Sequence, residues 1–173
     1  MSDGGHECCE ACGFDGSVYD DVALAQSIDA LGERWRALLV EAAGELRVRP
    51  SPDIWSALEY AAHSRDITAL HAFGVEQALT QDEPRYPAIE ADALIEASAM
   101  TYNEEEHDAV VAQLDREARR LAACARSGGA ANWSRGITIG EQRHTVRRLL
   151  EHALHDSIHH LDDVERGLQS LRS

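Results

Sequence analysis

The chain has 173 residues, enough for one domain whose hydrophobic core needs neither disulfides nor metal to fold. Its 31 acidic and 16 basic residues give a formal net charge of -15 and a pI near 4.9, which argues against binding to nucleic acid or to an anionic membrane. The polar N-terminus and the lack of an 18-residue apolar run predict neither a signal peptide nor a transmembrane helix, so we expect a soluble cytoplasmic protein.

The four cysteines are distributed unevenly, since three of them lie within the first twelve residues. A secreted disulfide framework has a different distribution, so the pattern favours a reducing compartment. Cys124 lies in an alanine-rich segment and is interpreted as a small buried hydrophobic residue, not a nucleophile. The other three are Cys8, Cys9 and Cys12.

Cys9 and Cys12 have the C-x-x-C spacing of half a zinc knuckle, and Gly13 can make the tight turn after it. The fourth ligand of a structural zinc site would have to be His6 or a distant residue. A redox C-x-x-C is a second interpretation, although no strand is predicted before it. A tail with adventitious cysteines is a third. We treat residues 1–20 as a Cys-rich segment that precedes the bundle.

Apolar residues recur at helical spacing from an N-cap at Asp20 or Asp21 to about Ala43, which predicts the first helix. Gly44 is expected to end it, and two prolines within residues 47–52 force an extended link. The composition, rich in Ala, Leu, Glu and Arg and poor in β-branched residues, also favours helices over strands.

The second helix is expected to be capped by Ser51 or Asp53 and to end at Gln81. Residues 82–103 contain two prolines and a partly helical stretch, and a crossover of this length suits second and third helices that run parallel. The third helix is predicted over roughly 104–126. The segment W-S-R-G-I-T-I is the only part with strand character, and it leads into the last helix.

Glu59, His63 and Asp66 share one face of the second helix. A lone histidine on a helix is more often structural than a ligand. Here Glu59 or Asp66 could orient the imidazole of His63, which favours His63 as a candidate metal ligand. His71, about two turns further along the same side, is interpreted as a structural residue.

The stretch H-A-L-H-D-S-I-H-H-L-D-D, residues 152–163, concentrates four of the nine histidines and three carboxylates, which together indicate a metal. At about 100° per residue, Asp156 and His160 lie on one shoulder of the apolar stripe of this last helix. His155 and His159 point to roughly the opposite side. Both are i,i+4 pairs, whose members stack on one helix face. The phase favours Asp156 with His160, and His155 with His159 stays as the alternative pair.

With four helices, W-S-A-L-E-Y-A-A-H-S-R-D in the second and H-D-S-I-H-H-L-D-D-V in the last, nearly the whole chain resembles the DinB/YfiT-like superfamily. This resemblance implies an all-α fold, a four-helix bundle over residues 21–173 with a long crossover between helices 2 and 3. Many members bind one divalent metal through a His on the second helix, and a His or Glu and a later His on the last. Relatives include mycothiol S-transferases and mycothiol-dependent maleylpyruvate isomerase. The C-G-F-D segment is similar to that of an actinobacterial subgroup.

The resemblance places the metal ligands at His63, Asp156 and His160, because the family's polar residue three positions after the last ligand is Asp163 here. The assignment agrees with the helical phase. Asp156 departs from the usual His or Glu, and its shorter side chain leaves direct and water-mediated ligation both open. Zinc is the first expectation, with nickel, iron and manganese as alternatives.

The resemblance further implies a metal-dependent enzyme that activates a low-molecular-weight thiol, as an S-transferase or isomerase, or water, as a hydrolase. The alternatives are a non-catalytic bundle that holds a metal or small ligand, and a bundle with metal-free polar residues in its interior. The expected partners are a small-molecule substrate and a low-molecular-weight thiol, without nucleic acid or membrane, and a homodimer is left open. A second zinc at Cys9 and Cys12 is a further expectation.

Overall fold

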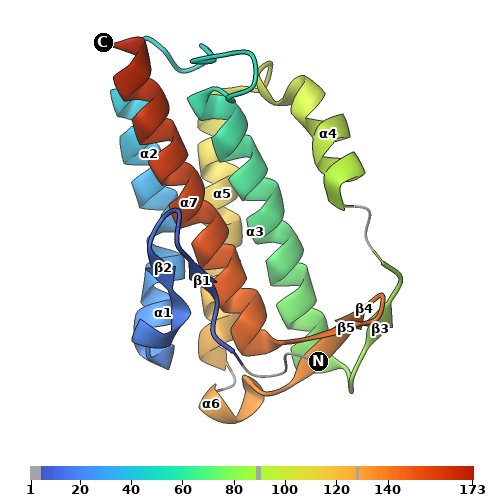
Figure 1. Cartoon of the computed structure of the whole chain (residues 1–173). Coiled ribbons are helices and arrows are strands. Elements are labelled where there is room, and N and C mark those ends of the chain that lie inside the picture. The colour runs from blue at the N-terminus through green and yellow to red at the C-terminus, as the bar shows by residue number, and fades with distance from the viewer. Residues whose placement is uncertain (1–4, 89–90, 128) are drawn as a thin grey trace.

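The computed structural model describes residues 5–88, 91–127 and 129–173, and its long helices pack side by side as a four-helix bundle (Figure 1). The all-α, four-helix prediction is confirmed. The first bundle position is shared by two consecutive helices, and a single helix fills each of the others. The bundle helices are α1 (Asp21–Asp29), α2 (Leu31–Glu41), α3 (Ala57–Thr80), α5 (His107–Ser127) and α7 (Val146–Leu171).

The first helix is not continuous as predicted, because the chain bends at Ala30, where α1 ends and α2 begins. Gly32 follows the bend at a point where two backbones come close. A Cβ on Gly32 would lie 2.6 Å from the Cα of Asp115 on α5. The missing side chain therefore lets the start of α2 lie directly against α5, in line with the close packing of both short helices on α5.

The cap of α3 differs from the prediction of Ser51 or Asp53. The hydroxyl of Ser56 accepts a hydrogen bond from the backbone N–H of Glu59, and the Glu59 carboxylate accepts one from the N–H of Ser56. This reciprocal capping box satisfies two N–H groups that the helix itself leaves unpaired. Ser51 instead pairs with Ile54 in a turn before the helix.

The crossover between α3 and α5 carries a helix and a strand of its own, and Figure 1 shows α3 and α5 running in the same direction, as predicted. The predicted strand segment forms β4 and leads into β5 and α7. In the small sheet, β3 pairs parallel with β4, and β4 pairs antiparallel with β5. These elements are β3 (Arg85–Tyr86), α4 (Ala91–Tyr102), α6 (Gly129–Asn132), β4 (Gly136–Ile139) and β5 (Gln142–Thr145).

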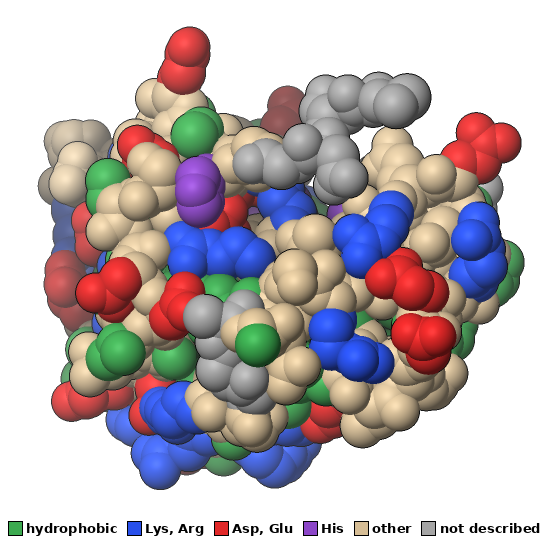
Figure 2. Space-filling model, turned by 90° about the horizontal axis from the view of Figure 1, so that it is seen from below, with side chains coloured by type: hydrophobic (Ala, Val, Ile, Leu, Met, Phe, Trp, Pro, Cys, Tyr) green, Lys and Arg blue, Asp and Glu red, His purple; other side chains and the backbone are tan. Residues whose placement is uncertain are grey.

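The core lies between the bundle helices and is made mainly of leucine and alanine side chains, with Trp35 fully buried among them. The end of the bundle near the small sheet carries basic and acidic side chains in alternation (Figure 2). Arg143 and Glu83, for example, form an ion pair of 2.7 Å there. Among the described residues, no helix combines the length and the apolarity that crossing a bilayer requires.

The N-terminal segment forms a hairpin that lies against α7 (Figure 1). Strand β1 (Cys8–Cys9) pairs antiparallel with β2 (Phe14–Asp15), and a single 3-10 turn (Gly16–Val18) leads to α1. The C-x-x-C therefore begins inside a strand, which the sequence did not predict. Gly13 has a φ of 72° in the turn between the strands, a conformation that glycine adopts without strain. The predicted tight turn after the C-x-x-C is present.

Candidate metal centre

Helices α3 and α7 bring the three predicted ligands together inside the bundle. The Nε2 atoms of His63 and His160 each lie 3.6 Å from Oδ1 of Asp156, and one donor atom from each residue fits within 4.8 Å of the others. The side chains are 7%, 18% and 15% exposed for His63, His160 and Asp156. A polar cluster on two facing helices, nearly closed to solvent, thus lies where the helical phase of α7 placed it.

The distances within this cluster are those of ligands around an ion, not those of hydrogen bonds. A separation of 3.6 Å is too long for a hydrogen bond. Two ligands of one tetrahedral zinc, at about 2.1 Å from the metal, are separated by about 3.4 Å. The buried Nδ1 of His63 and Oδ2 of Asp156 also make no hydrogen bond with described residues. Such unpaired buried polar atoms are costly unless a ligand satisfies them.

The pKa shifts of Asp156 and His160 favour the protonation states that bind metal. Burial acts to raise the pKa of Asp156, but the imidazoles of His63 and His160 hold this pKa below its ordinary value, so the carboxylate is ionised. Burial lowers the pKa of His160 against the opposite effect of Asp156 and Asp163. A neutral imidazole next to a carboxylate is the pair that a divalent ion requires.

Asp163 fixes the orientation of one ligand. Its Oδ2 lies 2.9 Å from Nδ1 of His160, and a carboxylate can only accept this hydrogen bond. The proton of His160 is therefore on Nδ1, and the lone pair of Nε2 faces the cluster. Arg166 holds the other oxygen of Asp163 at 2.5 Å.

Aromatic rings line the same site. Trp55 packs edge-on against the ring of His63, with 5.4 Å between centroids, and Tyr60 packs against His160 at 5.0 Å. These ring contacts restrain the two imidazoles. Trp55 and Tyr60 flank the start of α3, and sequence reasoning did not assign them to the site.

The carboxylates that flank His63 do not orient it, which corrects the sequence prediction. Glu59 accepts from Ser56 and from the guanidinium of Arg49. Asp66 accepts from Arg65 and from the hydroxyl of Tyr102. Both carboxylates are therefore engaged by hydrogen-bond donors other than His63. The helical wheel placed them near His63 but could not show these competing partners.

His71 is a structural residue, as interpreted from the sequence. Its buried Nδ1 donates to the carbonyl of Ile67, 2.8 Å away in the same helix. Burial lowers the pKa of His71 to about 4, and the nearby His152 adds to this effect.

Two cavities occur elsewhere on the bundle, between α2 and α5. Their volumes are about 540 and 360 Å³. Arg36 and Val40 line both of them, and none of the three predicted metal ligands lines either. These cavities are thus separate from the candidate centre.

The alternative pair, His155 and His159, lies on the other side of α7 and meets the C-x-x-C of the N-terminal hairpin. Donor atoms of His155, His159, Cys9 and Cys12 fit within 4.8 Å of one another. All four cysteines of the chain are free, and Cys8 is exposed and outside this group. The two pairs point in different directions from α7, as expected for positions about 100° apart in helical phase.

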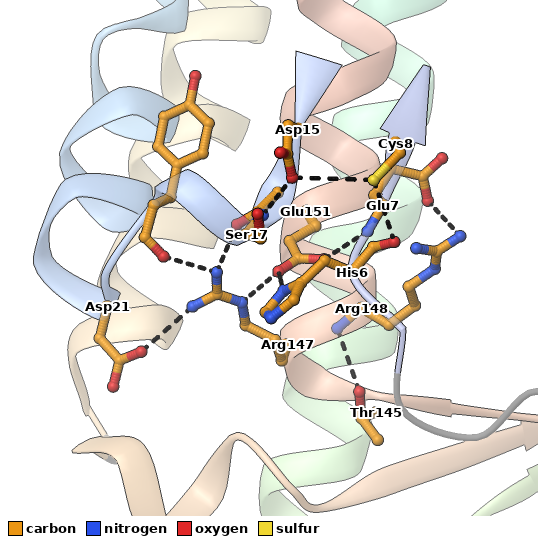
Figure 3. A network of polar contacts seen from close by, with 12 residues as sticks. His6, Glu7, Cys8, Asp15, Ser17, Asp21, Thr145, Arg147, Arg148 and Glu151 are labelled. Atoms are coloured by element: carbon orange, nitrogen blue, oxygen red, sulfur yellow. Dashed lines mark hydrogen bonds and ion pairs between the residues drawn. The ribbon is translucent and has the colours of Figure 1, made fainter. Parts of the chain in front are cut away.

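His6 does not join this second group, although the sequence left it open as the fourth ligand. Its Nδ1 lies 2.7 Å from Oε1 of Glu151, a carboxylate that is 1% exposed (Figure 3). Glu151 also accepts from the backbone N–H of Glu7 at 2.9 Å and from Arg147. Sequence reasoning missed these anchors; the available signal was a glutamate on the apolar side of the last helix.

Comparison with known proteins gives one family and one solved structure. The sequence model described as the DinB superfamily matches residues 23–164. Among curated proteins, none matches the sequence. The solved structure of YfiT from Bacillus subtilis is similar with a TM-score of 0.74 at 16% sequence identity, covering 98% of this chain and 95% of that one. YfiT is described as a probable metal-dependent hydrolase with an unusual four-helix bundle topology.

Proposed function

The chain belongs to the DinB superfamily, and from this premise we propose that it is a divalent-metal-dependent enzyme that activates a low-molecular-weight thiol or water in the bundle. One observation carries the proposal. Three buried donors from α3 and α7 converge at separations that suit ligands of one ion and are too long for hydrogen bonds. The proposed ligands are His63, Asp156 and His160.

The donor set leaves positive charge at the centre. Two neutral imidazoles and one carboxylate contribute a single negative charge against the two positive charges of the ion. A divalent ion held there would supply the Lewis acidity that lowers the pKa of a thiol or of water, so that the anion is available near neutral pH. Zinc suits nitrogen and oxygen donors, and nickel, iron and manganese accept the same set.

The chain's own residues position these donors. Asp163 keeps the proton of His160 on Nδ1 and so aims the Nε2 lone pair at the centre. Trp55 and Tyr60 restrain the two imidazole rings. No protein nucleophile is required, because the attacking group is a thiolate or hydroxide.

Two reactions fit this centre. Thiol transfer is favoured by the resemblance to mycothiol-dependent enzymes, and hydrolysis is supported by the similarity to YfiT, a probable metal-dependent hydrolase. A non-catalytic metal-binding bundle is the alternative.

The test measures the metal and the activity together. Purified protein loaded with zinc, nickel, iron or manganese would be assayed for thiol addition to a panel of electrophiles and for hydrolysis of ester and amide substrates. We expect metal-dependent turnover in wild type. In His63→Ala, we expect the loss of one equivalent of metal and at least about a 1000-fold loss of activity, since removing an outer-shell partner alone typically costs 10- to 100-fold.

His71→Ala is the matched control, because it removes another buried histidine of α3 that lies outside the cluster. It should keep the metal content of wild type. An unchanged metal content in both His63→Ala and His160→Ala would rule out this site. Full metal occupancy without turnover on any thiol or hydrolytic substrate would favour the non-catalytic alternative.

A further inference from the structure

The outer side of α7 carries a second group of donors whose chemistry differs from that of the bundle interior. We propose that this group is a structural zinc site, and that its ion fastens the N-terminal hairpin to the last helix. The proposal does not rest on the function of the interior centre. Its four ligands are Cys9, Cys12, His155 and His159.

The spacing of the donors fits one tetrahedral ion. Zinc binds sulfur at about 2.3 Å and imidazole nitrogen at about 2.1 Å, so a sulfur and a nitrogen around it are separated by about 3.6 Å. The Sγ of Cys9 lies 3.7 Å from Nδ1 of His159. All four donor atoms lie within 4.8 Å of one another, and a small contraction around an ion would bring the widest pairs to tetrahedral distances. Two cysteines and two histidines are a complete ligand set for structural zinc.

The hairpin holds the two sulfur atoms in one short segment. Cys9 ends strand β1, and Cys12 lies in the turn that leads to β2. One C-x-x-C turn thus supplies both sulfurs, as in half of a zinc knuckle.

The imidazole of His155 is held in place by the hairpin. Phe14 is 5% exposed and stacks on this ring, with 5.2 Å between centroids. Oε1 of Glu7 lies 3.1 Å from Nδ1 of His155, within ion-pair distance. Both ring nitrogens of His155 are buried and make no hydrogen bond with described residues, so either has a lone pair or proton left without a partner.

The other imidazole has a similar arrangement. Nε2 of His159 lies 3.7 Å from Oδ2 of Asp163, and Nδ1 faces Cys9. Each histidine of the group therefore has a carboxylate within ion-pair distance of its ring, Glu7 for His155 and Asp163 for His159.

The charge balance indicates a structural role. Two thiolates cancel the two positive charges of zinc, and four protein donors fill its tetrahedral shell. No coordination position remains for a substrate. The ion would instead join residues that are 150 positions apart, Cys9 and His159, and would add to the contacts of Glu151 and Arg147 that already hold this segment (Figure 3).

Cobalt distinguishes the two sites, because only the outer one contains sulfur. The reduced, chelator-treated full chain would be titrated with Co²⁺ and then with Zn²⁺. We expect a sulfur-to-cobalt charge-transfer absorption that saturates at one equivalent and disappears when zinc displaces cobalt. The absorption should be absent in the double variant Cys9→Ser, Cys12→Ser, and His159→Ala should bind cobalt at least about tenfold more weakly.

Two variants serve as controls. Cys8→Ser removes an exposed thiol of the same segment and should keep the absorption. His63→Ala should also keep it while losing the interior equivalent, so failure of the function proposed above would not be confused with failure of this site.

Limited proteolysis measures how readily the N-terminal hairpin separates from α7. Chymotrypsin cleaves after Phe14 only when this buried residue leaves α7, so cleavage should be at least about tenfold faster in the double variant than in zinc-loaded wild type or Cys8→Ser. Circular dichroism would confirm that the double variant keeps its helices. Wild type without a sulfur-to-cobalt absorption, or the same absorption in the double variant, would overturn the proposal, and the wild-type result stands even where the variant fails to fold.

Discussion

Two donor groups lie on different sides of one stretch of α7, and they differ in donor atoms, charge and the segment they face. The inner group faces α3 and offers two imidazoles and a carboxylate, and the outer group faces the N-terminal hairpin and offers two imidazoles and two sulfurs. Their contributions from α7 are the same i,i+4 pattern shifted by one residue, 156 and 160 against 155 and 159. The two groups are therefore about 100° apart around the helix axis. A divalent ion in the inner group would keep a net positive charge and an open coordination position, and one in the outer group would be neutral and four-coordinate.

The largest expected effect is on the pH dependence of stability, and it concerns His71, an imidazole that burial keeps neutral in the bundle interior. His71 has a pKa lowered to about 4 by burial, against 6.5 in the unfolded chain. Between these values the unfolded chain binds a proton that the folded protein does not, so stability falls as pH falls from 6.5 to 4. In metal-free wild type, the free energy of unfolding should fall between pH 7 and pH 4. His71→Gln should make this fall smaller by about 3 kcal/mol, as measured by urea unfolding at the two pH values.

His107→Gln is the control for this prediction, because its imidazole is half exposed and lies at the start of α5. It should keep the pH dependence of wild type. A wild-type pH dependence in His71→Gln would show that titratable groups other than His71 cause the loss of stability at acid pH.

A smaller effect is expected when the hairpin loses its hydrophobic anchor. Phe14→Ala removes the ring that stacks on His155 and should weaken zinc binding at the outer group by about 30-fold, equivalent to about 2 kcal/mol of lost packing. The interior group should keep its affinity. Competition with a chromophoric zinc chelator measures both. An equal loss at both groups would show that the hairpin supports the whole of α7 and would remove the distinction between the two sides.

The smallest effect concerns the carboxylate that lies between the two groups. Asp163→Asn removes the acceptor for Nδ1 of His160 and should weaken interior metal binding by about tenfold. The outer group should change less, because Asp163 lies 3.7 Å from His159, beyond hydrogen-bond distance. The same competition assay gives the loss of metal affinity at the inner group relative to the loss at the outer group. A larger loss at the outer group would contradict this order.

Helix periodicity predicted the bundle helices and the pair of Asp156 and His160, and the resemblance to the family added His63 to this group. Apolar spacing located the helices, and the phase of the last helix separated Asp156 from His155. The bend at Ala30 was missed because it follows from the close approach of Gly32 to α5, a contact between distant segments. The outer group was predicted only in halves, Cys9 with Cys12 and His155 with His159. Joining them requires knowing that the hairpin folds back onto α7, and the glutamate at 151 does not by itself show which distant segment it anchors.

The span of 150 residues between Cys9 and His159 also sets an order of events during synthesis. The C-x-x-C is translated before α3, α5 and α7, because all three helices follow it in the sequence. The hairpin therefore cannot dock on α7 until these helices have been made, and the contact between Cys9 and His159 forms late in folding.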